Sequence, residues 1–140
     1  MARITSRTAE ETVELGKKLA LHLGKGSVVT LHGSLGSGKT TLVKGIAAGL
    51  GIDEYITSPS FTLISEYEGS LHLYHMDLYR IDSIEEFEML GAEELMYDDG
   101  VTLIEWAEKI SDILPEHHIS VSFIIESGGY RTITVEGVDI

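Results

Sequence analysis

The sequence predicts an α/β fold in which a sheet of mixed parallel and antiparallel strands is flanked by helices. Segments whose apolar residues recur at helical spacing alternate with short apolar runs, which is the pattern of strand–helix units. Two pairs of strand-like segments are separated by short connections that contain glycine, which indicates antiparallel hairpins. The chain has 140 residues and no internal repeat or linker-like tract, so we expect residues 1–140 to form a single domain.

The first fifty residues predict a helix, a strand and a second helix. Thr8 and Glu11 form a capping box, and apolar residues then recur at helical spacing, so we expect a helix over residues 9–23. The β-branched and apolar residues of 27–32 predict a short buried strand. After a glycine-rich turn, residues 39–50 place apolar side chains at i, i+4 and i+8, which predicts the second helix.

The two expected hairpins lie in the middle of the chain and near its end. Residues 61–67 and 71–77 are strand-like and flank a connection that contains Gly69. Residues 119–125 and 130–135 flank a pair of glycines, which favours a closing hairpin. Hairpin strands are antiparallel, whereas strands joined through a helix are parallel, so the two kinds of unit together predict a mixed sheet.

Between the hairpins the sequence predicts one helix and one buried strand. Ser83 and Glu86 form a second capping box, and Gly91 supplies a helix stop. Residues 101–105 are a short apolar run that ends in an acid, and we expect them to form a buried strand. Residues 82–99 carry eight acids and no basic residue, so this segment is either a solvated helical face or a docking surface for a basic partner.

The charge balance disfavours several functions. Ten lysine and arginine residues stand against 23 aspartate and glutamate residues, which gives a formal net charge of −13. Because affinity for nucleic acids and anionic membranes comes from basic residues, direct binding of DNA, of tRNA or of a membrane surface is disfavoured. The chain has no cysteine, which excludes a disulfide framework and a thiolate nucleophile. No apolar run is long enough to span a membrane and no signal-like stretch opens the chain, so we expect a cytoplasmic protein.

Residues 33–40, Gly-Ser-Leu-Gly-Ser-Gly-Lys-Thr, match the phosphate-binding loop G-x-x-x-x-G-K-[ST] at every fixed position. Glycines allow successive backbone N–H groups to surround a phosphate, and the helix that follows adds its positive end. We expect Lys39 to contact the β- and γ-phosphates, Thr40 to supply a hydroxyl to Mg²⁺, and Thr41 to reach the α-phosphate. The candidate phosphate-binding residues are Gly33, Ser34, Leu35, Gly36, Ser37, Gly38, Lys39, Thr40 and Thr41.

Two strand-end acids are candidates for the second oxygen ligand that a magnesium nucleotide needs. Glu105 ends an apolar run, the pattern of a Walker B strand, and we expect it to hold Mg²⁺ together with Thr40, directly or through water. Asp77 ends the second hairpin strand with His75 on the same face, and we assign it to orienting the attacking water or to the outer shell of the metal. Lys39, Asp77 and Glu105 are therefore the candidate catalytic residues; a solvated strand-end acid is the alternative for each carboxylate.

The residue types that the chain lacks narrow the choice of nucleotide. There is no asparagine, which the guanine-reading Asn-Lys-x-Asp element of GTPases requires, so ATP is the favoured ligand. Arginine occurs only at positions 3, 7, 80 and 131, so the arginine-rich lid of small-molecule kinases is not visible. Arg80 either approaches the γ-phosphate or forms a structural ion pair. Two alternatives to an ATPase stay open: a small-molecule phosphotransferase, and a nucleotide-dependent binding module whose hydrolysis is incidental.

Five elements occur along the chain in a characteristic order. They are the start of the phosphate loop, Ser-Pro-Ser-Phe at 58–61, His-Met-Asp-Leu-Tyr-Arg at 75–80, Leu-Gly at 90–91 and Ile-Glu-Trp at 104–106. In this order and at these intervals, over residues 12–115, they resemble the TsaE family, the bacterial ATPases of tRNA threonylcarbamoyladenosine biosynthesis. Many unrelated proteins share the phosphate loop, so the His-x-Asp-Leu-Tyr-Arg and Glu-Trp elements make the resemblance specific.

The resemblance implies a P-loop NTPase-type three-layer fold, binding of ATP with Mg²⁺, and weak ATP hydrolysis by the isolated protein. It also implies partnership with the TsaB–TsaD complex, in which TsaD transfers threonylcarbamoyl to adenosine 37 of tRNAs that read ANN codons. ATP hydrolysis by TsaE would reset that complex between turnovers, and the tRNA would be held by the partners. Residues 58–61 match a switch-like loop of the family that senses the γ-phosphate region.

The resemblance also assigns roles to single residues. Lys39 and Thr40 match the phosphate and magnesium ligands of the family, and Glu105 matches its metal-binding acid. Asp77 matches a second essential acid, and Trp106 matches an aromatic residue close to the nucleotide. The chain departs from the family pattern at three positions where alanine, threonine and proline are usual, namely Ser37, Ser60 and Ala107.

Overall fold

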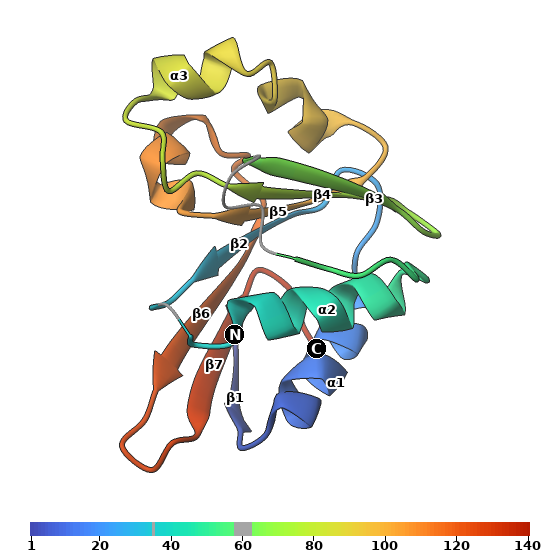
Figure 1. Ribbon diagram of the computed structural model, residues 1–140, viewed down its shortest axis with the longest axis vertical. Coiled ribbons are helices and arrows are strands. Elements are labelled where there is room, and N and C mark those ends of the chain that lie inside the picture. The colour runs from blue at the N-terminus through green and yellow to red at the C-terminus, as the bar shows by residue number, and fades with distance from the viewer. Residues whose placement is uncertain (35, 58–62) are drawn as a thin grey trace.

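A seven-stranded sheet forms the centre of the computed structural model, which describes residues 1–34, 36–57 and 63–140 (Figure 1). The strand order across the sheet is β1-β7-β6-β2-β5-β4-β3. The strands are β1 (Ala2–Ser6), β2 (Val28–His32), β3 (Ile64–Glu68), β4 (His72–Asp77), β5 (Val101–Glu105), β6 (Ile119–Ile125) and β7 (Arg131–Glu136). Helices cover both faces, so the predicted three-layer α/β fold is confirmed.

The sheet is mixed, as the sequence predicts. Its centre is parallel, because β2 pairs in parallel with both β5 and β6, and β4 pairs in parallel with β5. The two predicted hairpins are confirmed as the antiparallel pairs β3–β4 and β6–β7. The carboxyl ends of β2, β4 and β5 therefore meet at one edge of the sheet, which is where parallel sheets place their ligands.

Both predicted capping boxes begin helices. Thr8 Oγ1 accepts a hydrogen bond from the N–H of Glu11 at 3.1 Å at the start of α1 (Ala9–Ala20). Ser83 Oγ accepts from the N–H of Glu86 at 3.3 Å at the start of α3 (Ile84–Met89). Helix α1 ends earlier than residue 23, the end that the sequence predicts. The amide groups that follow the helix donate to carbonyl oxygens three residues back, which tightens the chain into a turn.

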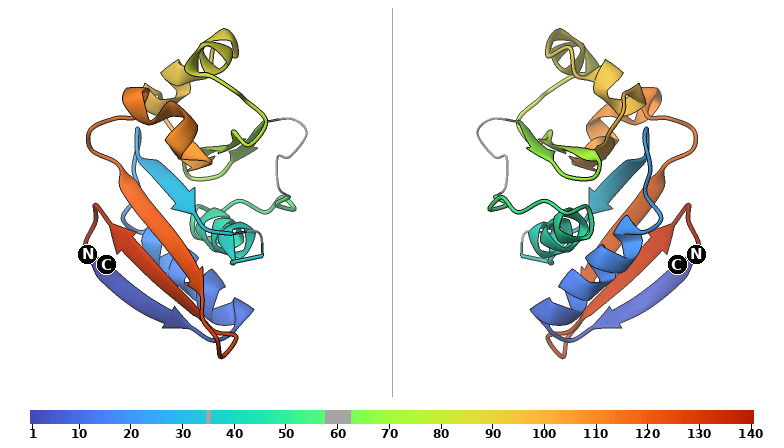
Figure 2. Two further views of the ribbon diagram at one scale, coloured as in Figure 1. Left: turned by 90° about the vertical axis from the view of Figure 1, so that its left-hand side faces the viewer. Right: turned by 90° about the vertical axis from the view of Figure 1, so that its right-hand side faces the viewer.

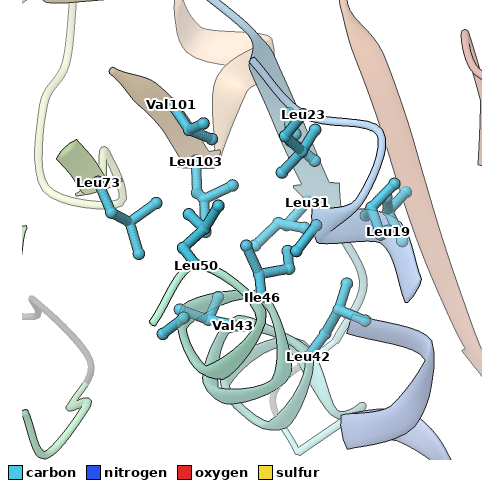
Figure 3. Packing of buried hydrophobic residues seen from close by; sticks show 14 of the residues in the cluster. Leu19, Leu23, Leu31, Leu42, Val43, Ile46, Leu50, Leu73, Val101 and Leu103 are labelled. Atoms are coloured by element: carbon cyan, nitrogen blue, oxygen red, sulfur yellow. The ribbon is translucent and has the colours of Figure 1, made fainter. Parts of the chain in front are cut away.

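The two faces of the sheet carry different helices and separate clusters of apolar side chains. Helix α1 packs with α2 (Lys39–Gly49) on one face, and α3 lies on the other with two short 3₁₀ helices, η1 (Glu93–Tyr97) and η2 (Ala107–Ile113) (Figure 2). Neighbouring residues of one strand serve opposite faces, since Val28 belongs to the α3 side and Val29 to the α1–α2 side. Figure 3 shows Leu42, Val43 and Ile46 of α2 packed toward the sheet.

Glycines bring α1 and α2 almost into backbone contact. A Cβ on Gly45 would lie 2.2 Å from the carbonyl oxygen of Val13, and one on Gly16 would lie 2.5 Å from that of Leu42. No side chain fits at either position, so the two helices touch along a strip of bare backbone. This contact holds the start of α1 beside the phosphate loop that precedes α2.

Three elements of the fold have no counterpart in the sequence prediction: β1, η1 and η2. Strand β1 pairs antiparallel with β7, with Ala2 opposite Val135 and Ser6 opposite Arg131, so it forms one edge of the sheet. The 3₁₀ helices cover the face that carries α3. Within the described part of the chain, no helix is long and apolar enough to cross a lipid bilayer.

Candidate functional site

The phosphate loop joins the end of β2 to the start of α2, and its glycines adopt backbone angles that other residues rarely reach. Gly33 has φ 154° and Gly38 has φ 112°. A Cβ on Gly33 would lie 2.7 Å from Ser37 Oγ and 3.1 Å from the carbonyl oxygen of Phe123, so this turn has no room for a side chain. Gly38 is the N-cap of α2 and no described side chain caps the helix, which leaves its first N–H groups available to an anion.

Lys39, the first residue of α2, points from the loop toward the end of β5. Its Nζ donates a hydrogen bond to the carbonyl oxygen of Gly33 at 2.8 Å and lies 3.6 Å from Oε1 of Glu105. Only 12% of the lysine side chain is exposed. The ammonium group is therefore held between the phosphate loop and the strand-end carboxylate, in the position from which a lysine can reach the outer phosphates of a nucleotide.

Asp77 and Glu105 are neighbours at the ends of β4 and β5. Their Cα atoms are partners in the parallel register of the two strands, so both side chains project from the same face at the same edge. Asp77 Oδ1 accepts the N–H of Tyr79 at 3.0 Å, which orients this carboxylate at the start of the following turn. Glu105 is buried, with 6% of the residue exposed. The structure thus brings together the two acids that the sequence singled out.

The environment of Glu105 favours its charged form. Burial raises the pKa of this carboxyl group, but four interactions together outweigh burial and hold the net pKa below its ordinary value. They are the hydrogen bond with His75, the charge of His75, the charge of Lys39 and the hydrogen bond with Lys39. His75 Nε2 lies 2.9 Å from Glu105 Oε2. A charged, oriented carboxylate at a strand end is the chemistry that Mg²⁺ prefers in a ligand.

A cavity of about 860 Å³ lies over the phosphate loop and the two acids. Its size is that of a pocket for a nucleotide-sized ligand. Predicted site residues that line it are Gly36, Gly38, Lys39, Thr40, Thr41, Asp77, Glu105 and Trp106. Tyr79 and Arg80 line the same cavity, so Arg80 stands near the site. The structure therefore gathers most of the predicted residues around one hollow.

Some predicted residues lie elsewhere or outside the description. Gly33 and Ser34 belong to the loop but do not line the cavity, and Ser37 is buried with no partner for its hydroxyl among the described residues. Leu35 and the switch-like segment at 58–61 lie outside the described residues. Their predicted roles stay predictions.

Another part of the cavity wall comes from segments that the sequence does not single out. It is formed by the junction of β1 and α1, including Arg7 and Thr8, and by Arg131 of β7. Arg131 donates hydrogen bonds to the carbonyl oxygens of Gly36 at 3.0 Å and Gly129 at 2.7 Å. The scarcity of arginine was a signal in the sequence that could have pointed to this wall. The strongly acidic chain has only four arginines, and three of them, Arg7, Arg80 and Arg131, line the cavity.

Trp106 follows Glu105 and stands at the rim of the cavity. Its backbone lies in the left-handed region, with φ 62° and ψ 37°, which is uncommon for a bulky residue and marks local strain. The residue is 37% exposed, and the centroid of its ring lies 5.2 Å from that of Tyr79. An aromatic platform therefore borders the cavity next to the strand-end acids.

Comparison with known proteins identifies the family. Residues 6–133 match the family described as Threonylcarbamoyl adenosine biosynthesis protein TsaE. Over 133 residues the chain is 49% identical to the tRNA threonylcarbamoyladenosine biosynthesis protein TsaE of Treponema pallidum, covering 95% of this chain and 98% of that relative. The Bacillus subtilis protein of the same name is 44% identical over 130 residues, covering 92% of this chain and 81% of that relative.

A solved structure supports the same assignment. The crystal structure of Bacillus subtilis YdiB superposes on this fold with a TM-score of 0.85 and 37% sequence identity, covering 99% of this chain and 86% of that one. The predicted fold is therefore shared with a structure that is also related in sequence. Taken with the family match, these findings show that the chain belongs to the TsaE family.

Proposed function

We propose that this chain is a Mg²⁺-dependent ATPase that serves the formation of threonylcarbamoyladenosine at position 37 of tRNAs reading ANN codons. One observation carries the proposal: the uncapped start of α2 and Lys39 face the paired carboxylates of Asp77 and Glu105 across one cavity. The name of the relatives, tRNA threonylcarbamoyladenosine biosynthesis protein TsaE, supports the pathway.

The residues fit a magnesium nucleotide. The turn at Gly33 has no room for a Cβ, which suits a loop that closes around phosphates. The environment of the buried Glu105 carboxylate favours its charged form, which suits a cation. In this proposal the loop N–H groups and Lys39 hold the β- and γ-phosphates, and Thr41 lies toward the α-phosphate. Thr40 and Glu105 would hold Mg²⁺, which when bound neutralises charge on the phosphates.

Asp77 would orient the attacking water. Its carboxylate lies beside Glu105 at the strand ends and lines the cavity, while its hydrogen bond from the N–H of Tyr79 fixes its direction. A positioned carboxylate contributes about 10²–10⁴-fold to a step that moves a proton. Of the three arginines that line the cavity, Arg131 is bound to the carbonyl oxygens of Gly36 and Gly129, and Arg7 lies over the ring of Tyr130. Neither arrangement directs a guanidinium group at a γ-phosphate, so we expect slow turnover by the isolated chain.

We propose TsaB and TsaD as the partners and infer that residues 1–140 act as one functional domain. The net charge of −13 disfavours direct contact with tRNA or DNA, so the tRNA would be bound by the partners. The β1–β7 pairing, which joins the two ends of the chain within one sheet, supports a single unit. Docking of the partners would raise the rate of ATP hydrolysis.

The test is multiple-turnover formation of threonylcarbamoyladenosine on tRNA by purified TsaB and TsaD, supplied with threonylcarbamoyl-adenylate and ATP, with and without this chain. We expect sustained product only with the chain, and loss of product with Lys39→Ala. Lys44→Ala is the matched control, because Lys44 is an exposed lysine of the same helix. Equal product without the chain would overturn the proposal.

Phosphate transfer to a metabolite rather than to water would instead identify a small-molecule phosphotransferase. A different result, full activity of Asp77→Ala in tRNA modification together with retained ATP binding, would identify a nucleotide-dependent binding module. Measuring ATP hydrolysis by the chain alone and with TsaB and TsaD tests the partner effect. A rate that the partners leave unchanged would contradict stimulation.

A further inference from the structure

Lys109 connects two segments of the chain that lie just beyond the catalytic acids. It belongs to η2, which follows β5 and Trp106. Its Nζ donates hydrogen bonds to the carbonyl oxygens of Tyr79 and Ile81, the latter at 2.8 Å. Both carbonyl groups belong to the connection that follows β4 and Asp77. One ammonium group therefore ties the segment after β5 to the segment after β4.

The same ammonium group also contacts the aromatic rim of the cavity. Lys109 Nζ lies 5.5 Å from the ring centroid of Tyr79 and 5.8 Å from that of Trp106, within the range of cation–π attraction. The two rings lie 5.2 Å apart. Two carbonyl oxygens and two aromatic rings thus surround one cation, and each of the two segments supplies a ring.

This use of a lysine is unusual in so acidic a chain. Acids outnumber basic residues 23 to 10, yet none of the ion pairs formed by the described residues involves Lys109. The N–H groups of its ammonium donate instead to backbone carbonyl oxygens. These hydrogen bonds hold a segment of the main chain in place, whereas an ion pair would hold only a side chain. A lysine that only improved solubility would keep its ammonium group in water.

The contacts of Lys109 bear on both acids through the backbone. The N–H of Tyr79 donates to the carboxylate of Asp77 at 3.0 Å, while the carbonyl oxygen of Tyr79 accepts from Lys109. On the other side, the N–H of Lys109 donates to the carbonyl oxygen of Trp106 at 3.2 Å. Trp106 is the strained residue next to Glu105, and strain of this kind persists only where surrounding contacts fix it.

We infer that Lys109 is a positioning residue for ATP hydrolysis, which holds the two turns that follow Asp77 and Glu105 in a fixed relation. It does not line the cavity, so it acts through the backbone and not on the nucleotide. This inference rests on the proposed ATPase activity. We therefore expect Lys109 to affect the rate of hydrolysis more than nucleotide binding, because the phosphate loop is a separate segment of the chain.

The test compares Lys109→Met and Lys109→Arg with the wild type. Methionine keeps the length and apolar character of the stem but removes the cation, whereas arginine restores several N–H donors and stacks on aromatic rings. Lys44→Met is the matched control, because Lys44 Nζ also lies over an aromatic ring, that of Tyr55 at 5.7 Å, but away from the cavity. Thermal unfolding establishes that each variant is folded.

We expect Lys109→Met to lower kcat for ATP hydrolysis about tenfold or more, since small misplacements of catalytic groups cost up to about 10²-fold. The Kd for ATP with Mg²⁺ should change by less than about threefold, and Lys109→Arg should recover most of kcat. Lys44→Met should match the wild type in both. An unchanged kcat in Lys109→Met, or an equal loss in Lys44→Met, would overturn the inference.

A second readout needs no nucleotide and separates this inference from the proposed function. In the free protein, hydrogen exchange at the N–H of Tyr79 should be faster in Lys109→Met than in the wild type, and the emission of Trp106, the only tryptophan, should shift. If the wild type fails to hydrolyse ATP, the proposed function fails, while this readout still decides whether Lys109 holds the two turns. Unchanged exchange and emission would show that it does not.

Discussion

His75 Nε2 lies 2.9 Å from a carboxylate oxygen of Glu105, and the imidazole is completely buried in the sheet. The other ring nitrogen, Nδ1, has no hydrogen-bond partner among the described residues. The carboxylate is therefore the one polar contact found for His75 in that part of the chain. A buried histidine with this single contact orients Glu105, and together with Lys39 it favours the charged carboxylate.

The lowered pKa of Glu105 predicts how its contribution to stability depends on pH. Burial acts to raise this pKa, but the hydrogen bond and charge of His75 and the charge of Lys39 lower it below 4.5. The contribution is therefore fully present above about pH 4.5 and is lost as the pH falls through the lower, folded-state pKa. We expect the difference in unfolding free energy between wild type and Glu105→Gln to shrink on acidification, measured by urea unfolding between pH 7 and pH 3.

Glu108→Gln provides the matched control for that series, because Glu108 is an exposed acid of the adjoining η2 helix. The difference in unfolding free energy between wild type and Glu108→Gln, measured over the same range, gives the baseline for an exposed acid of that segment. If the difference in unfolding free energy between wild type and Glu105→Gln stays constant down to pH 3, the environment of Glu105 does not favour the charged form.

Replacement of Asp77 by asparagine should separate ATP binding from hydrolysis. The asparagine carbonyl oxygen can still accept the N–H of Tyr79, so the turn is retained while the charge is removed. We expect the Kd for ATP with Mg²⁺ to stay within about threefold and kcat to fall about 100-fold, the usual weight of a group that assists proton transfer. Asp82→Asn, an exposed acid of the same connection, should behave as the wild type. Normal turnover by Asp77→Asn would remove Asp77 from the mechanism.

The fluorescence of Trp106 should report nucleotide binding. Trp106 is the only tryptophan, lines the cavity and is 37% exposed, so a ligand there alters the solvent around the indole. We expect titration with ATP and Mg²⁺ to change the emission in a saturable manner, and Lys39→Ala to abolish the change. If calorimetry detects binding while the emission stays constant, Trp106 does not adjoin the nucleotide.

A methyl group at Gly45 should destabilise the protein. A Cβ there would lie 2.2 Å from the carbonyl oxygen of Val13, so α1 and α2 must separate. Overpacking of this kind costs about 1–3 kcal/mol, which lowers Tm by several degrees. Gly24→Ala is the control, because a Cβ at Gly24 meets no atom within 4 Å. Equal melting temperatures for Gly45→Ala and Gly24→Ala would contradict the close contact of the two helices.

The parts of the fold that the sequence predicts are those specified by local patterns. The capping residues Thr8 and Ser83 lie within three residues of the amides that they cap, and the hairpins need only short connections. Strand β1 is different, because its five residues are stabilised by pairing with β7, far along the chain. The helices η1 and η2 lack the 3.6-residue periodicity by which a helix is detected in a sequence.

The candidate site divides in the same way. The phosphate loop follows a fixed local spacing, and Asp77 and Glu105 each end an apolar run, so all were predictable. The direct pairing of the two acids depends on the register of β4 and β5, and no local sequence pattern predicts that register. Lys109 has no sequence signature at all, because its partners are backbone carbonyl groups that every residue possesses.

The pairing of Ser6 with Arg131 sets an order of assembly for the candidate site. The phosphate loop is a strand, a turn and a helix in succession, and its strand β2 needs only β5 and β6 as partners. The wall beside the loop needs β1 and β7, whose pairing closes a longer stretch of chain than the pairings of β2 and carries the larger closure entropy. We expect the growing or refolding chain to acquire a turn that binds phosphate first, and a walled cavity that encloses a whole nucleotide only when its two ends meet.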